Sequence, residues 1–206
     1  MGSRGRSPLF DGIEPEMENW LTMTETRSPF LTDALRTFRG YKKRTEAAFA
    51  QLRREDWFRL IDPEANSIAI IVKHLAGNMR SRWTDFLASD GEKPNRDRDS
   101  EFVLDSSTTP EQVREWWEQG WQLVFAAVEP LTADDLGRKV TIRGQEHTVL
   151  EAINRQLTHY AEHIGQIILL AKHFRGAEWK SLSIPKGQSA SLGAAAELAR
   201  RQSRGT

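Results

Sequence analysis

Apolar residues recur at the spacing of an amphipathic helix in four segments of this chain, and this repetition constrains the fold more than any other feature. Within each segment they follow one another at intervals of three and four residues, which gathers them on one face of a helix. The segments cover about 29–56, 67–88, 110–129 and 148–174. In the last segment the apolar stripe consists of Leu150, Ile153, Leu157, Ile164, Ile168 and Ala171. Four such helices predict an all-α protein, an antiparallel four-helix bundle.

Each segment starts at a residue type that caps helices. Ser28 stands before a proline, the favoured first helical residue, and Asn66 or Ser67 can cap the second helix. Thr109 and Thr148 each have Gln or Glu three positions later, which is the signature of a capping box. These residues therefore predict where each of the four helices begins.

The connections divide the chain further. RKVTIRGQEHTV alternates apolar and polar residues around Arg143 and Gly144, which predicts a small β-hairpin before the last bundle helix. The charged, turn-rich stretch from Asp90 to Phe102 predicts a long surface loop, and long loops in small domains often carry function. We expect an N-terminal arm over 1–27, the bundle over 28–188, and a tail or short helix over 189–206.

Composition removes several classes of function. Lys and Arg total 29 and Asp and Glu total 29, so no net charge attracts the chain to nucleic acid. There is no cysteine, so any metal must be held by histidines and carboxylates. No apolar stretch approaches the roughly 20 residues that cross a bilayer, and the start lacks the apolar core of a secretory signal. We therefore expect a cytoplasmic protein without a membrane partner.

Three histidines form the strongest candidate site. His159 and His163 are four residues apart in the last helix, so their imidazoles leave the same face one turn apart. His74 lies beside the apolar stripe of the second helix. Three neutral nitrogens from two helices can hold a divalent ion and leave positions open on it. The alternative is that these are core histidines; His147 and His173 are expected to be structural or solvated.

The runs HLAGNMRSRWTDFLASDGEKPNRDRDSEF and RQLTHYAEHIGQI resemble the DinB/YfiT-like superfamily of bacterial metal-binding bundles, in a branch described as a domain of unknown function. In that superfamily one histidine comes from the second helix and two come from the last. His74, His159 and His163 match these positions. The resemblance covers about residues 28–188. It implies a Zn or Ni ion that activates water or a low-molecular-weight thiol, in an S-transferase or a hydrolase acting on a small molecule. The alternative is a non-catalytic metal-binding or stress-related interaction protein.

Acids and arginines near the histidines have two interpretations. Asp85 and Glu162 are the nearest acids by helical position, and either is a candidate to orient a histidine or to act as a base. Three arginines are candidates to hold an anionic substrate or the carboxylate of a thiol cofactor. The favoured interpretation is that they pin the loop through Asp97, Asp99 and Glu101. These arginines are Arg82, Arg96 and Arg98.

Aromatic residues also suggest self-association. Trp116, Trp117 and Trp121 lie in one helix, and Trp20 and Leu21 lie in the arm. A small bundle does not easily bury so much apolar surface, so we expect a homodimer.

Overall fold

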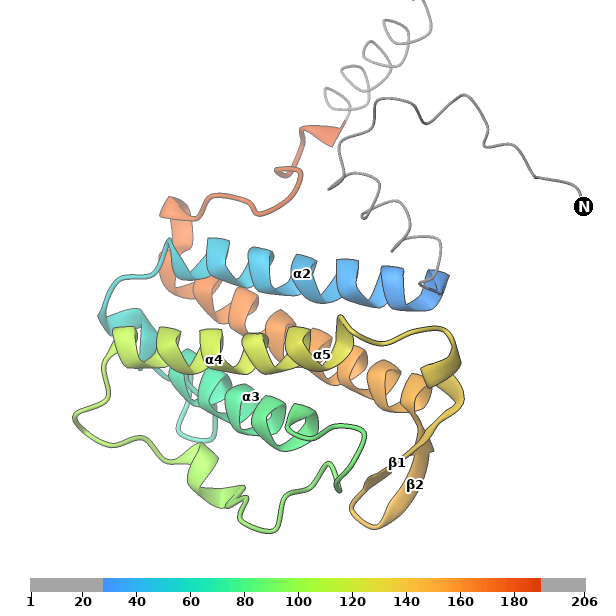
Figure 1. The fold of residues 1–206 in the computed structure, drawn as a ribbon. Coiled ribbons are helices and arrows are strands. Elements are labelled where there is room, and N and C mark those ends of the chain that lie inside the picture. Colours follow the sequence, from blue (N-terminus) through green and yellow to red (C-terminus); the bar gives the residue numbers. More distant parts are fainter. Residues whose placement is uncertain (1–27, 190–206) are drawn as a thin grey trace, which may run out of the picture.

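The computed structural model describes residues 28–189, in which four α-helices surround one apolar core (Figure 1). Helix α3 packs against α4 and α5, and α2 packs against α5 and α4. This arrangement is consistent with the predicted antiparallel bundle. The helices are α2 (Pro29–Phe49), α3 (Ile68–Trp83), α4 (Pro110–Val128) and α5 (Val149–Arg175). The predicted arm (1–27) and nearly all of the predicted tail (189–206) lie outside the described residues.

The predicted helix starts are confirmed, because the capping side chains accept backbone hydrogen bonds. Ser28 Oγ accepts from the Leu31 amide, and Ser67 rather than Asn66 caps α3. Thr109 Oγ1 accepts from the third residue of α4 at 3.3 Å. Thr148 and Glu151 form the complete capping box, each side chain bonded to the backbone amide of the other. These bonds satisfy amide groups that the first turn of a helix leaves without partners.

The first helix is shorter than predicted, ending at Phe49 instead of about 56. The Arg53 amide donates to Asp56 Oδ2 at 3.0 Å, which favours a short 3₁₀ turn, η2 (Glu55–Trp57). This turn carries the Trp57 ring onto Phe49, with ring centroids 4.6 Å apart. Burial of Trp57 thus replaces the last predicted turns of helix.

The second helix also ends early, at Trp83 instead of about 88. Thr84 is extended, with ψ 126°, and Asp85 has a positive φ of 48°. The reversal returns Phe86 to the Trp83 ring, with centroids 4.9 Å apart. Phe86 also lines a small cavity together with Val140 and Ala152, so packing against distant residues accompanies this helix end.

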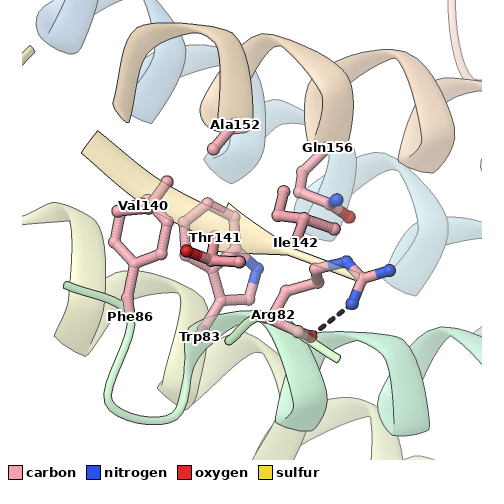
Figure 2. Close-up of a pocket in the computed structure, with 9 residues that line it drawn as sticks. Arg82, Trp83, Phe86, Val140, Thr141, Ile142, Ala152 and Gln156 are labelled. Carbon is pink, nitrogen blue, oxygen red and sulfur yellow. Dashed lines mark hydrogen bonds between the residues drawn. The ribbon is translucent and has the colours of Figure 1, made fainter. Parts of the chain in front are cut away.

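The predicted hairpin is confirmed as β1 (Lys139–Ile142) paired antiparallel with β2 (Gln145–Thr148). Arg143 and Gly144 both have positive φ, 56° and 72°, as a two-residue hairpin turn of type I′ requires. Figure 2 shows β1 packed over the end of α3, with Ala152 and Gln156 of α5 on the other side. The remaining cavity of about 10 Å³ has room for about one water molecule.

The core buries half of the sixteen aromatic residues between 28 and 189, and the other half are partly buried. Trp117 and Trp121 are at most 2% exposed, and Trp121 packs against Phe38 with centroids 5.9 Å apart. Leu150, predicted in the core, is 39% exposed because its neighbours Val149 and Ala152 face the core in this turn of α5. Within residues 28–189, no helix combines the length and apolar character that crossing a bilayer requires.

Candidate metal centre

The structure brings the three predicted histidines together, His74 from α3 and His159 and His163 from α5. His159 Nε2 lies 3.4 Å from His74 Nε2 and 3.2 Å from His163 Nε2. One nitrogen of each residue lies within 4.8 Å of the others. Two nitrogens bound to one tetrahedral zinc ion at 2.0–2.1 Å would lie about 3.3 Å apart. The cluster therefore has the spacing of a three-nitrogen metal site.

Hydrogen bonds at the far side of two rings orient them toward a common centre. His74 Nδ1 donates to Glu101 Oε2 at 2.9 Å, and His163 Nδ1 donates to Gln166 Oε1 at 3.0 Å. A neutral imidazole that donates through Nδ1 carries its lone pair on Nε2. Both Nε2 lone pairs thus face His159, and a cation between the rings would satisfy all three nitrogens.

Burial keeps these rings in the form that binds metals. It lowers the pKa of His159 to about 3, helped by the neighbouring His163 and His74 rings. Burial likewise lowers the pKa of His163 below its ordinary value. Because only the neutral imidazole offers a lone pair, both residues are ready ligands at neutral pH.

Glu101, which the sequence did not single out as a partner of a histidine, completes the surroundings of His74. It lies in a 3₁₀ turn of the long loop, η3 (Asp99–Phe102), and its side chain is 7% exposed. Burial raises the pKa of Glu101, but hydrogen bonds from His74 and Arg96 outweigh it and hold the pKa below its usual range. The carboxylate is therefore ionised and fixes the His74 ring.

Gly77 makes room for this carboxylate against α3. A Cβ atom at position 77 would lie 2.6 Å from Glu101 Cδ, which is closer than side chains approach one another. The helix face therefore needs a glycine at this point for Glu101 to reach His74. The sequence predicted Glu101 as a partner of the loop arginines but not of His74, because helical spacing gives no position to loop residues.

The predicted pinning of the loop is confirmed for Arg96 through Glu101, whereas Arg82 holds the loop through partners that were not predicted, and Asp97 and Asp99 form no ion pair with an arginine within residues 28–189. Arg96 donates to both carboxylate oxygens of Glu101, at 2.7 and 2.9 Å, and to Glu92 at 3.1 Å. Arg82 donates to the Gly91 carbonyl and to Glu92 (Figure 2 draws the first bond). Arg98 instead lies over the Phe102 ring, 5.5 Å from its centroid, and no carboxylate in residues 28–189 pairs with it.

The two candidate acids occupy different places. Asp85 is exposed beyond the end of α3 and does not line the cleft at the histidines. Its predicted place beside His74 was wrong because it assumed that the helix continued to residue 88. Glu162 does line that cleft, while Glu101 takes the role of orienting a histidine.

An open cleft of about 490 Å³ leads to the histidine cluster. That size falls within the range of pockets that bind small molecules. Histidine, arginine, amide, hydroxyl and carboxyl side chains surround it. They are His74, Asn78, Arg82, Arg96, Arg98, Arg143, Arg155, Gln156, Thr158, His159 and Glu162.

Fold and site together define a helical protein with a three-histidine cluster that could hold a metal ion. The chain belongs to the family described as "Protein of unknown function (DUF1572)", whose model matches residues 25–188. The predicted assignment to a domain-of-unknown-function family is thereby confirmed. A comparison with curated proteins found no match.

Proposed function

We propose that this chain is a metal-dependent enzyme of the DinB-like superfamily whose Zn or Ni ion is bound by His74, His159 and His163. The convergence of three Nε2 atoms at 3.2 and 3.4 Å supports the proposal most directly. Glu101 and Gln166 also support the proposal, because their hydrogen bonds fix the tautomers of His74 and His163 in which Nε2 carries the lone pair.

A divalent ion in such a site lowers the pKa of a water or thiol that enters its open positions. The residues of the chain would supply the rest of the chemistry. Glu162, at the rim of the same cleft, would accept the released proton. The cleft would admit a small-molecule substrate or a low-molecular-weight thiol, for hydrolysis or S-transfer.

A non-catalytic metal-binding or interaction protein is the second candidate, because the same cluster can hold an ion without turnover. Two assays on zinc-loaded and nickel-loaded protein separate the candidates: consumption of a small thiol in the presence of an electrophile, and hydrolysis of ester and amide substrates. Turnover that disappears in Glu162→Gln while the metal stays bound supports the enzyme. Metal binding without turnover in either assay supports the second candidate.

Metal content tests the site itself. Protein purified without a histidine tag and dialysed should retain about one ion per chain, or take up added Zn or Ni to that level. His74→Ala, His159→Ala and His163→Ala should each lower that content strongly, because a site reduced to two ligands loses a bond and its geometry. His173→Ala, an exposed histidine on the same helix, is the matched control.

Stability distinguishes ligands from ordinary core histidines. The apolar core should keep the metal-free chain folded, unlike a zinc finger. If the residues are not ligands, His163→Ala should cost about 1 to 3 kcal/mol with no metal effect. Unchanged metal content in both His74→Ala and His163→Ala would rule out the triad.

We also retain the homodimer and the cytoplasmic location as proposals. The tryptophans of α4 lend the dimer little support, since Trp117 and Trp121 are buried within the chain. Trp20 and Leu21 lie outside the described residues. Sedimentation decides the matter, because a 23.5 kDa species at micromolar concentration would exclude the dimer.

A further inference from the structure

The cleft at the histidine cluster carries an excess of positive charge. Five of the side chains that line it are arginines, and one, Glu162, is an acid. Glu92 and Glu101 pair with three of these arginines, which leaves an excess of about two positive charges in a protein that is formally neutral as a whole. Neutral histidines do not offset it, and a bound divalent ion would increase it. A field of this kind attracts anions to the cleft.

Not all five arginines are free to meet a ligand. Arg82 and Arg96 have side chains only 5% exposed, and both are occupied by Glu92, Glu101 or the Gly91 carbonyl. Arg143 is exposed but its Nε donates to Glu92 at 2.9 Å. These three therefore serve mainly to build the wall of the cleft.

Arg98 and Arg155 differ from the others, because each is exposed and neither pairs with a carboxylate in the part of the chain that the structure describes. Arg98 rests only on the Phe102 ring. Guanidinium groups form two parallel hydrogen bonds with a carboxylate or a phosphate. Both arginines thus retain this capacity for a ligand.

The two arginines approach the cleft from different elements. Arg155, His159 and His163 follow one another at intervals of four along α5, so Arg155 stands one turn from the cluster on the same face. Arg98 immediately precedes η3, the turn whose Glu101 holds His74. A ligand gripped by Arg98 and Arg155 would therefore lie beside the histidines.

We infer that the cleft binds a small molecule bearing an oxyanion, a carboxylate or a phosphate, which Arg98 and Arg155 hold while its remainder faces the three histidines. Binding of the oxyanion depends on the arginines alone, whereas the role of this molecule as a substrate rests on the proposed function. The volume of about 490 Å³ suits a small molecule better than a polymer. The class of substrate is thus an acid or a phosphate ester.

Calorimetric titration of the full chain with succinate and with inorganic phosphate tests this inference. Each probe is added to metal-free and to zinc-loaded protein. Arg98→Gln and Arg155→Gln should each weaken binding to metal-free protein about tenfold, because each removes a charge-assisted pair of hydrogen bonds. The double variant should abolish binding. The preferred probe tells whether the site favours a carboxylate or a phosphate.

Arg44→Gln is the matched control, since it removes one exposed arginine of α2 that lines none of the described cavities. It should bind both probes as the parent chain does. All variants should have the melting temperature of the parent chain. Equal melting temperatures would exclude unfolding as the cause of any weaker binding.

Several results would overturn the inference. They are binding of neither probe at millimolar concentration, equal weakening in Arg44→Gln, and unchanged affinity in the double variant. Zinc content distinguishes failure of the oxyanion site from failure of the metal site. If zinc binds normally but the arginine variants bind the probes unchanged, the oxyanion site is wrong and the metal site stands. If zinc does not bind but the arginine variants lose affinity for the probes, the metal site is wrong and the oxyanion site stands.

Discussion

His74 Nδ1 donates a hydrogen bond of 2.9 Å to Glu101 Oε2, although the two residues are 27 positions apart. His74 belongs to a helix and Glu101 to a loop, and both side chains are nearly fully buried. The bond fixes the His74 tautomer and turns Nε2 toward His159. The long loop is therefore part of the candidate site and not only a connection.

Replacing Gly77 by Ala should disturb the metal site without touching a ligand. The new methyl group would displace Glu101, because its Cβ would lie 2.6 Å from Glu101 Cδ. We expect a loss of about 1 to 3 kcal/mol of stability and weaker zinc binding. Thermal unfolding and zinc titration measure both effects. Gly40→Ala is the control: nothing lies within 4 Å of a Cβ there, and the helix should gain about 0.5 to 1 kcal/mol. Parental zinc affinity in Gly77→Ala would contradict the role given to Glu101.

Arg96→Ala and Arg98→Ala should separate a buried ion pair from a free arginine. Arg96 is nearly buried against Glu101, so its removal should cost about 3 kcal/mol by leaving a poorly compensated charge. Arg98 pairs with no acid among residues 28–189, and its removal should change stability by less than about 0.5 kcal/mol. We expect the metal content of folded protein to stay the same in both. Equal melting temperatures for the two variants would be inconsistent with the observed ion pairs.

Glu92 should make stability depend on acid pH. Burial opposes ionisation, but hydrogen bonds from Arg143 and Arg82 lower the pKa of Glu92 from its ordinary 4.5 to about 2. Because the folded-state pKa is the lower one, the stabilisation is complete above pH 4.5 and is lost as pH falls toward 2. Solvent screens this partly exposed group, so Glu92→Gln should cost about 1 kcal/mol at pH 7. Chemical unfolding at pH 7, 4.5 and 3 measures the free energy of unfolding. Between pH 7 and pH 3 it should fall less in the variant than in the parent chain. Glu64→Gln, at an exposed site, is the control, and its free energy of unfolding should depend on pH as that of the parent chain does.

Tyr160→Phe should weaken the core beside the histidines while sparing metal binding. The buried hydroxyl accepts from Trp83 Nε1 at 2.8 Å and donates to Asn78 Oδ1 at 3.3 Å. Loss of the hydroxyl leaves two buried polar groups without this partner, which should cost about 1 to 3 kcal/mol. Denaturant unfolding gives the cost, and metal analysis should show no change. In the half-buried control, Tyr41→Phe, stability should shift by less than about 0.5 kcal/mol.

Local chemistry explains what the sequence predicted about the fold. A capping side chain acts on amides within one turn, so the starts of α2, α3, α4 and α5 follow from nearby residues. The Arg143–Gly144 turn acts over two residues and fixes the hairpin in the same way. Helical spacing also placed His159 and His163 on one face.

By itself the sequence determined the four helices, the hairpin and the pairing of His159 with His163, because each depends on residues a few positions apart. The resemblance to a family supported the addition of His74, which lies 85 positions before His159 and reaches it only in the folded chain. Tertiary structure decided where α2 and α3 end, since Trp57 and Phe86 beyond these points are buried in the common core, Phe86 beside Val140. It also moved Asp85 away from the site and brought Glu101 to His74 through the space above Gly77. Such contacts join residues far apart in the chain, and their energy comes from packing and desolvation, which no local pattern of residues records.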